Sequence, residues 1–328
     1  MSDAFRELLS GLIDYAGLFP PAALPLEPAL ERYLEYRRGP DRWMLGRFIC
    51  PVSRLSALAE QVEARRELLA DPPLPISAIL APEVTPEETL AEVRAIAATN
   101  QRLAGVAAVE SAEVRLPVAL VSEARPSALG DALERARHLL TDHGTEAFDG
   151  PVFWERPLLG ELHRDALEAL IGELERFNVR HASSPPWGLK LRCGGLEAAA
   201  IPDPRALAVT VSLCQRRGVP FKATAGLHHP LRRHDAALRA KTHGFLNLFV
   251  GAVLAGPNEL GEPHLGELME DESAGDFRFE GDRLAWRSYE VDAAQVREQR
   301  RALATSFGSC SFDEPREDLV SLGLLEST

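Results

Sequence analysis

The sequence predicts an α/β protein, a (β/α)8 TIM barrel with a hairpin inserted near its C-terminal end. Short apolar segments rich in strand-forming residues alternate with amphipathic segments of helical period along almost the whole chain of 328 residues. Strands and helices that alternate with short connections form parallel sheets. Seven such units favour a closed barrel. No GxGxxG turn follows the first predicted strand, which argues against an open dinucleotide-binding sheet.

The seven predicted strands share an apolar, β-rich composition and turn residues at their ends. They are residues 12–19, 46–52, 75–80, 104–110, 151–155, 187–193 and 220–227.

The eighth strand has two candidates. Residues 242–255 (THGFLNLFVGAVLA) fit a strand or a buried helix equally well. We prefer residues 306–312, which precede a helical segment (REDLVSLGL). Between these candidates, DFRFEGDRLAWRS predicts a hairpin around Gly281, in an insertion at about 270–290. We therefore expect one barrel domain that spans residues 1–328.

Composition excludes several classes of protein. The formal net charge of −13 and the lack of a basic stripe argue against nucleic-acid binding. No segment resembles a signal peptide or a membrane span. The four cysteines lie far apart without CxxC spacing, which favours reduced thiols in the cytoplasm. We expect a small-molecule ligand, no nucleic-acid or membrane partner, and leave a homo-oligomer open.

Lysine is scarce in this chain. Of 36 basic side chains, only Lys190, Lys222 and Lys241 are lysines. Arginine does not lose its proton at useful pH, so only lysine can act as an amine nucleophile. A genome rich in arginine codons explains the scarcity of lysine. It does not explain why two lysines occupy matching places in neighbouring predicted strands.

Strand alternation places both lysines inside the barrel. Lys190 and Arg192 share one face of the sixth strand, and Lys222 and Thr224 share the same face of the seventh. Adjacent strands lie about 4.8 Å apart, so the two amines can approach each other. Their repulsion and their burial would both lower lysine pKa and free an amine for attack on a carbonyl. The alternative is that each lysine is paired with an interior carboxylate.

Two glutamates end the neighbouring strands. Glu110 closes the fourth predicted strand and Glu155 closes the fifth. Catalytic residues of barrels come from several strand ends at one face, so either carboxylate could move a proton. Equally, both could only neutralise the basic residues.

The segments GLKLRCGG and PFKATAGLHH resemble strands six and seven of deoxyribose-phosphate aldolase and related class I aldolases. In that family a Schiff-base lysine on strand six is followed by a second lysine in a K-[AS]-x-x-G turn. The resemblance implies that Lys190 forms the Schiff base and that Lys222 lowers its pKa. The chain departs from the family at Leu191-Arg192-Cys193. FKATAGLHHP and GSCSFDEP also resemble phrases of a bacterial (β/α)8 family of unassigned function, which implies kinship but no activity.

Histidines offer a different chemistry. His228 and His229 follow the seventh strand, and His243 comes shortly after. A divalent metal held by His228, His243 and Glu155 is an alternative, although the spacing matches no HxH or HExxH motif.

An anionic substrate is expected on the same face, because basic groups and glycines follow the late strands. The candidate substrate-binding residues are Asp14, Arg192, Thr224, His229 and Arg232.

The leading hypothesis is an aldolase-type lyase that forms a Schiff base with a small anionic carbonyl compound and needs no cofactor. Its candidate catalytic residues are Lys190, Lys222, Glu110, Glu155 and His228. One alternative is a metal-dependent barrel hydrolase or isomerase that uses His228, His229 and His243 with Glu155. The other is a protein that binds a small anion without catalysis.

Overall fold

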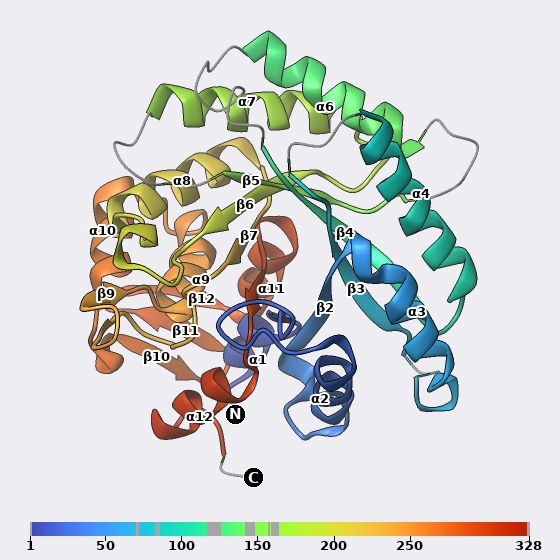
Figure 1. Cartoon of the computed structure of the whole chain (residues 1–328). Helices are drawn as coiled ribbons and strands as arrows, with labels where there is room; N and C mark the ends of the chain where they lie inside the picture. The colour runs from blue at the N-terminus through green and yellow to red at the C-terminus, as the bar shows by residue number, and fades with distance from the viewer. Residues whose placement is uncertain are drawn as a thin grey trace.

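The computed structural model describes residues 2–69, 72–82, 86–116, 126–141, 148–156, 158 and 164–326. Within these residues, parallel strands close into a barrel and helices surround it (Figure 1). The (β/α)8 fold predicted from the alternation of strands and helices is confirmed. Around the barrel, the strands are β1 (Ile13–Tyr15), β13 (Ala304–Ser309), β7 (Phe221–Thr224), β6 (Gly188–Arg192), β5 (Val152–Arg156), β4 (Ala107–Arg115), β3 (Leu74–Ile79) and β2 (Leu45–Pro51).

The preferred candidate for the last strand is correct. β13 pairs in parallel with both β1 and β7 and so closes the barrel. Most of the other candidate, residues 242–255, forms helix α9 (Phe245–Ala255), and each residue of this helix is buried. Phe249 of α9 packs on Phe221 of β7, with ring centroids 6.2 Å apart. An apolar helix that is buried on all sides shows no amphipathic period, which is why sequence alone could not separate it from a strand.

Helices cover the outside of the barrel (Figure 1). Those of the described residues are α1 (Asp3–Leu9), α2 (Leu26–Arg38), α3 (Leu55–Glu63), α4 (Pro86–Arg102), α6 (Pro126–Thr141), α7 (Arg164–Arg180), α8 (Pro204–Arg217), α9, α10 (Glu262–Glu270), α11 (Ala293–Ala302) and α12 (Asp313–Ser321). None of them is both long and apolar enough to cross a bilayer.

The predicted hairpin is present and has a third strand. β10 (Phe277–Glu280), β11 (Arg283–Trp286) and β12 (Tyr289–Asp292) form an antiparallel sheet outside the barrel. Gly281 makes the turn between the first two strands, with φ of 56°. A second small sheet, β8 (Arg233–Asp235) with β9 (Ala240–Thr242), follows β7.

Strand alternation separates an apolar exterior from a polar interior of the barrel. Outward residues such as Phe221 and Phe307 are buried against helices. The buried polar side chains of the strands include Asp14, Ser77, Ser111, Glu113, Glu155, Lys190, Lys222 and Ser306. Many TIM barrels fill this space with branched apolar residues, so a charged interior is the feature from which a function can be argued.

Candidate active site

Lys190 and Lys222 lie directly opposite each other on β6 and β7, as strand alternation predicted. Both side chains are almost fully buried. Lys190 Nζ lies 2.7 Å from Glu113 Oε2 and 2.8 Å from Glu155 Oε2. Lys222 Nζ donates to Glu113 Oε1 at 2.6 Å and to Asp14 Oδ2 at 2.8 Å. Each lysine therefore has two carboxylates within contact distance.

Glu113 of β4 is the centre of this cluster, because its two oxygens hold different lysines. Its Oε1 also accepts a hydrogen bond of 2.6 Å from the Ser77 hydroxyl, which in turn accepts one from Ser111. The carboxylate is thus fixed on both sides, and it joins the two lysines into one hydrogen-bonded system.

Asp14 of β1 completes the deeper end of the cluster. Besides the Lys222 ammonium group, its Oδ2 accepts a hydrogen bond from Ser306 at 2.7 Å, and its Oδ1 accepts one from the Arg47 backbone N–H at 2.7 Å. A fully buried carboxylate needs such partners to stay charged. This network spans strands β1, β2, β7 and β13.

The carboxylates and lysines stabilise each other's charges. Burial alone would raise the pKa of Glu113, but Lys190 and Lys222 outweigh it and hold that pKa well below its usual range. The pKa of Glu155 is lowered against burial by Lys190 and Arg192. For Lys190, burial opposes the charge, but Glu113 and Glu155 raise the pKa. The expectation that repulsion and burial lower the pKa of Lys190 is therefore wrong, because Lys190 contacts two carboxylates and Glu113 lies between it and Lys222.

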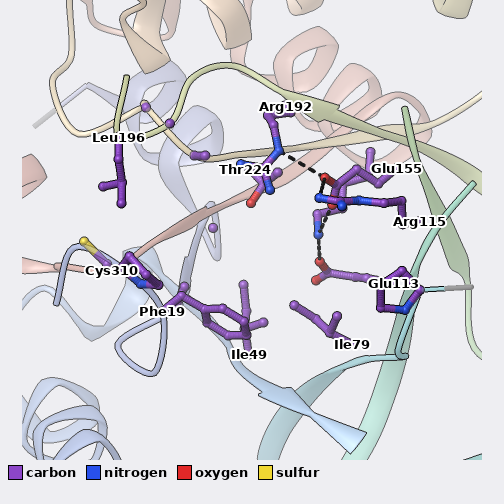
Figure 2. A pocket seen from close by; sticks show the side chains of 18 of the residues that line it. Phe19, Ile49, Ile79, Glu113, Arg115, Glu155, Arg192, Leu196, Thr224 and Cys310 are labelled. Carbon is purple, nitrogen blue, oxygen red and sulfur yellow. Dashed lines mark hydrogen bonds and ion pairs between the residues drawn. The ribbon is translucent and has the colours of Figure 1, made fainter. Parts of the chain in front are cut away.

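A cavity of about 440 Å³ opens at the cluster (Figure 2). Lys190 lines it, and Lys222 does not. The cavity volume is in the range of small-molecule sites. The lining residues come from the ends of the strands and the loops that follow them. They are Ala16, Phe19, Pro20, Pro21, Ile49, Ile79, Leu80, Pro82, Glu113, Val114, Arg115, Glu155, Lys190, Arg192, Gly195, Leu196, Thr224, Ala225, Gly226, His228, Gly308 and Cys310.

Two arginines of this cavity contact the same carboxylate. Arg192 Nε donates to Glu155 Oε1 at 3.1 Å, and a terminal nitrogen of Arg115 lies 3.6 Å from that oxygen. Glu155 therefore stands between an ammonium group on one oxygen and guanidinium groups on the other (Figure 2). Because a guanidinium has five N–H donors, each arginine can also bind an anion in the cavity.

The structure does not bring Glu110 to the lysines. Its side chain is 48% exposed and lies 3.5 Å from Arg47 Nε. β4 continues to Arg115, beyond the predicted end at Glu110, and its register with β3 shifts between Val109 and Ser111. This irregularity puts Ser111 in register with Ser77. The alternation in SAEVR was the signal that could have revealed Glu113 and Arg115.

The three candidate histidines contact different partners. His228 lines the cavity, and its Nδ1 lies 3.1 Å from Glu314 Oε2 of α12. His229 Nδ1 lies 2.6 Å from Asp318 Oδ2 of the same helix. His243 is buried, with Nε2 2.8 Å from the Pro202 carbonyl oxygen. Burial lowers the pKa of His243 to about 4.

The alternative metal set of His228, His243 and Glu155 is not assembled. In the described part of the chain, no three histidine, cysteine, aspartate or glutamate side chains gather as a metal site would require. His243 is occupied by a backbone carbonyl and by Arg232, whose Nη1 lies 3.4 Å from Nδ1.

The candidate substrate-binding residues fall into two groups. Arg192 and Thr224 line the cavity. Asp14 does not line the cavity but accepts a hydrogen bond from Lys222. His229 contacts Asp318, and Arg232 contacts His243.

The sequence matches no model of a known protein family, and no curated protein is detectably similar to it in sequence. In structure, the chain is similar to the deoxyribose phosphate aldolase from Aeropyrum pernix, described as a unique tetramer. That likeness has a TM-score of 0.42 and 14% identity, and it covers 69% of this chain and 80% of that one. This is a distant likeness of fold alone.

Proposed function

We propose that this protein is an aldolase-type lyase that forms a Schiff base between Lys190 and a small anionic carbonyl compound. The observation that carries the proposal is the position of Lys190 Nζ. It lies in the wall of a ligand-sized cavity, in contact with two carboxylates, and next to a second buried lysine.

The first requirement is a neutral amine. The raised pKa of Lys190 means that this group is charged in the unliganded site. Glu155 Oε2, at 2.8 Å, can take its proton directly. Glu113 is the poorer acceptor, because two ammonium groups stabilise its charge. Lys222 Nζ holds the other oxygen of Glu113 at 2.6 Å, so this carboxylate is shared and stabilises the charge of Lys190 less than an unshared carboxylate would.

The covalent steps then follow with balanced atoms. The Lys190 amine adds to the carbonyl carbon to give a carbinolamine. Glu155 passes the proton that it took from Lys190 to the departing hydroxyl group, which leaves as water, and a C=N iminium ion remains. A hydroxyl on the second carbon from the iminium carbon gives its proton to Glu155. The bond between this hydroxyl-bearing carbon and the carbon attached to the iminium carbon breaks. The hydroxyl-bearing carbon becomes an aldehyde, and the electron pair moves towards the iminium nitrogen to give an enamine. Protonation of the enamine carbon and hydrolysis restore Lys190.

Borohydride trapping tests this function. With a carbonyl substrate present, borohydride reduces the iminium to an amine. Lys190 then gains the mass of the substrate less one oxygen atom, located by peptide mass spectrometry. Lys190→Arg should abolish the label, because arginine stays protonated. Lys241→Arg is the matched control, since Lys241 is on the surface in an ion pair with Glu272. Full labelling of Lys190→Arg, or no label with any carbonyl compound, would rule out the proposal. Ligand binding without any label would instead favour a non-catalytic anion-binding protein.

A further inference from the structure

The cavity has two chemically different walls. The side formed by β4 to β7 carries the charged and polar groups, namely Glu113, Arg115, Glu155, Lys190, Arg192 and Thr224. The opposite side, formed by β1 to β3 and the segments after them, is apolar. Figure 2 shows Phe19, Ile49 and Ile79 on one side of the cavity and Arg192, Arg115 and Glu155 on the other.

The anion-binding groups lie very close to the reactive amine. A single carboxylate, that of Glu155, reaches from Lys190 Nζ at 2.8 Å to Arg192 Nε at 3.1 Å. An anionic group bound to Arg192 and Arg115 is therefore separated from the carbon that Lys190 attacks by a distance of about the width of one carboxylate group. A carboxylate bonded directly to the carbonyl carbon fits this spacing, whereas an anion at the far end of a substrate chain would meet the apolar wall.

The apolar wall offers few partners to a hydroxylated chain. Phe19, Ile49 and Ile79 have no polar side-chain atoms, and the prolines at 20, 21 and 82 have no backbone N–H. Burying a hydroxyl group without a hydrogen bond is unfavourable, while burying a methylene group is favourable.

Two isoleucines of the apolar wall lie on strands next to residues of the charged cluster. Ile79 is in register with Glu113 on the neighbouring strand, so both point into the barrel at the same level. Ile49 lies one layer deeper, in register with Ser77. A Cβ atom built on Gly308 would come within 2.9 Å of Ile49 Cδ1. A larger residue at position 308 of β13 would therefore displace the Ile49 side chain.

We propose that the substrate is a 4-hydroxy-2-oxo acid whose chain beyond the hydroxyl-bearing carbon is apolar. Its carboxylate binds Arg192 and Arg115, its oxo carbon meets Lys190 Nζ, and its side chain lies against Ile49 and Ile79, which determine specificity. This inference rests on the proposed Schiff-base function and adds the class of substrate.

A series of 2-oxo acids tests the inference in the full-length protein. Borohydride labelling of Lys190 is measured against concentration for pyruvate, 2-oxohexanoate and 2-oxoglutarate. We expect half-saturation to fall about fourfold for each buried methylene group, so 2-oxohexanoate should label at concentrations at least ~10-fold lower than pyruvate. 2-Oxoglutarate, which carries a charge where 2-oxohexanoate is apolar, should need the highest concentration.

Variants at Ile79 test whether the apolar wall causes the preference for 2-oxohexanoate over 2-oxoglutarate. Ile79→Thr and Ile79→Val both shorten the side chain, but only threonine adds a hydroxyl group. Ile79→Thr should reduce the preference for 2-oxohexanoate over 2-oxoglutarate by about tenfold, and Ile79→Val should keep most of it.

The two proposals fail in different ways. If Lys190 is labelled but 2-oxoglutarate is preferred, or if Ile79→Thr leaves the order unchanged, the substrate class is wrong and the Schiff-base function stands. If none of the probes or other carbonyl compounds labels Lys190, the function itself fails and the substrate class fails with it.

Discussion

Glu113 is the residue on which the charged interior depends most. It is buried and shared by two lysines, and Ser77 supports one of its oxygens. Removing one partner from a buried ion pair leaves an uncompensated charge, which costs far more than the pair itself contributes.

Replacing Glu113 by glutamine should therefore destabilise the protein strongly. We expect Glu113→Gln to lower the free energy of unfolding by about 3–5 kcal/mol, measured by urea denaturation at neutral pH. Glu110→Gln is the matched control on the same strand. Its side chain is half exposed, so its contact with Arg47 should contribute less than about 1 kcal/mol. Equal losses in the two variants would contradict the central place of Glu113.

His243 should make the protein sensitive to mild acid. Its pKa is lowered by burial to about 4 in the folded state, below the unfolded value of about 6.5. The unfolded chain thus binds more protons between these values, and stability rises with pH in that window. Stability from this group is complete above pH ~6.5 and is lost as pH falls towards ~4, by about 3 kcal/mol at ~1.4 kcal/mol per pH unit.

The variant His243→Gln should flatten that dependence. The measurement is the urea midpoint of each protein at several values between pH 4 and 7. His234→Gln is the control, because His234 is exposed on β8 and should leave the curve unchanged. A curve for His243→Gln parallel to that of the unmodified protein would assign the acid sensitivity to other groups.

At the scale of single elements, the ends of a helix depend on local residues, while the length of a strand depends on the strand beside it. α8 begins at the Asp203 cap with a proline in its first turn and ends at Gly218, which adopts the left-handed conformation with φ of 60°. These signals are local. The end of β4 is different, because its register shift against β3 depends on a neighbouring strand. The predicted strand therefore stopped before Glu113.

The capping box of α11 is one local signal whose contribution can be measured. The Asp292 side chain accepts a hydrogen bond of 2.8 Å from the Gln295 N–H, and the Gln295 side chain accepts one from the Asp292 N–H. Asp292→Ala should cost about 1 kcal/mol of stability in urea denaturation. Glu298→Ala, at an exposed position in the same helix, should change stability by less than about 0.5 kcal/mol. A loss of stability in Glu298→Ala as large as that in Asp292→Ala would contradict this expectation.

At the scale of the whole molecule, Arg300 joins the two ends of the chain. Its buried guanidinium donates to the backbone oxygens of Leu8 and Ser10 near the N-terminus and of Ala304 and Thr305 in β13. Phe5 of α1 also packs on Phe279 of β10, with ring centroids 5.0 Å apart. The first helix is thereby held to the segment that closes the barrel.

Loss of this connection should destabilise the whole fold. Arg300→Met leaves buried carbonyl groups without donors, which should cost at least about 3 kcal/mol. Arg301→Met removes the neighbouring exposed arginine and should cost less than about 0.5 kcal/mol. Thermal unfolding followed by circular dichroism compares the two, and equal melting temperatures would show that Arg300 has no such role.

The sequence by itself determined the barrel class and the inward direction of Lys190 and Lys222. Both follow from local periodicity: strands and helices alternate along the chain, and side chains alternate along each strand. Only the tertiary structure decided which carboxylates meet these lysines. Asp14 reaches Lys222 across 208 residues because β13 pairs with both β1 and β7, so only one strand separates these two. Glu113, rather than Glu110, lies between the lysines because of the irregular register of β4. Closure and register depend on contacts between distant segments, which no local pattern contains.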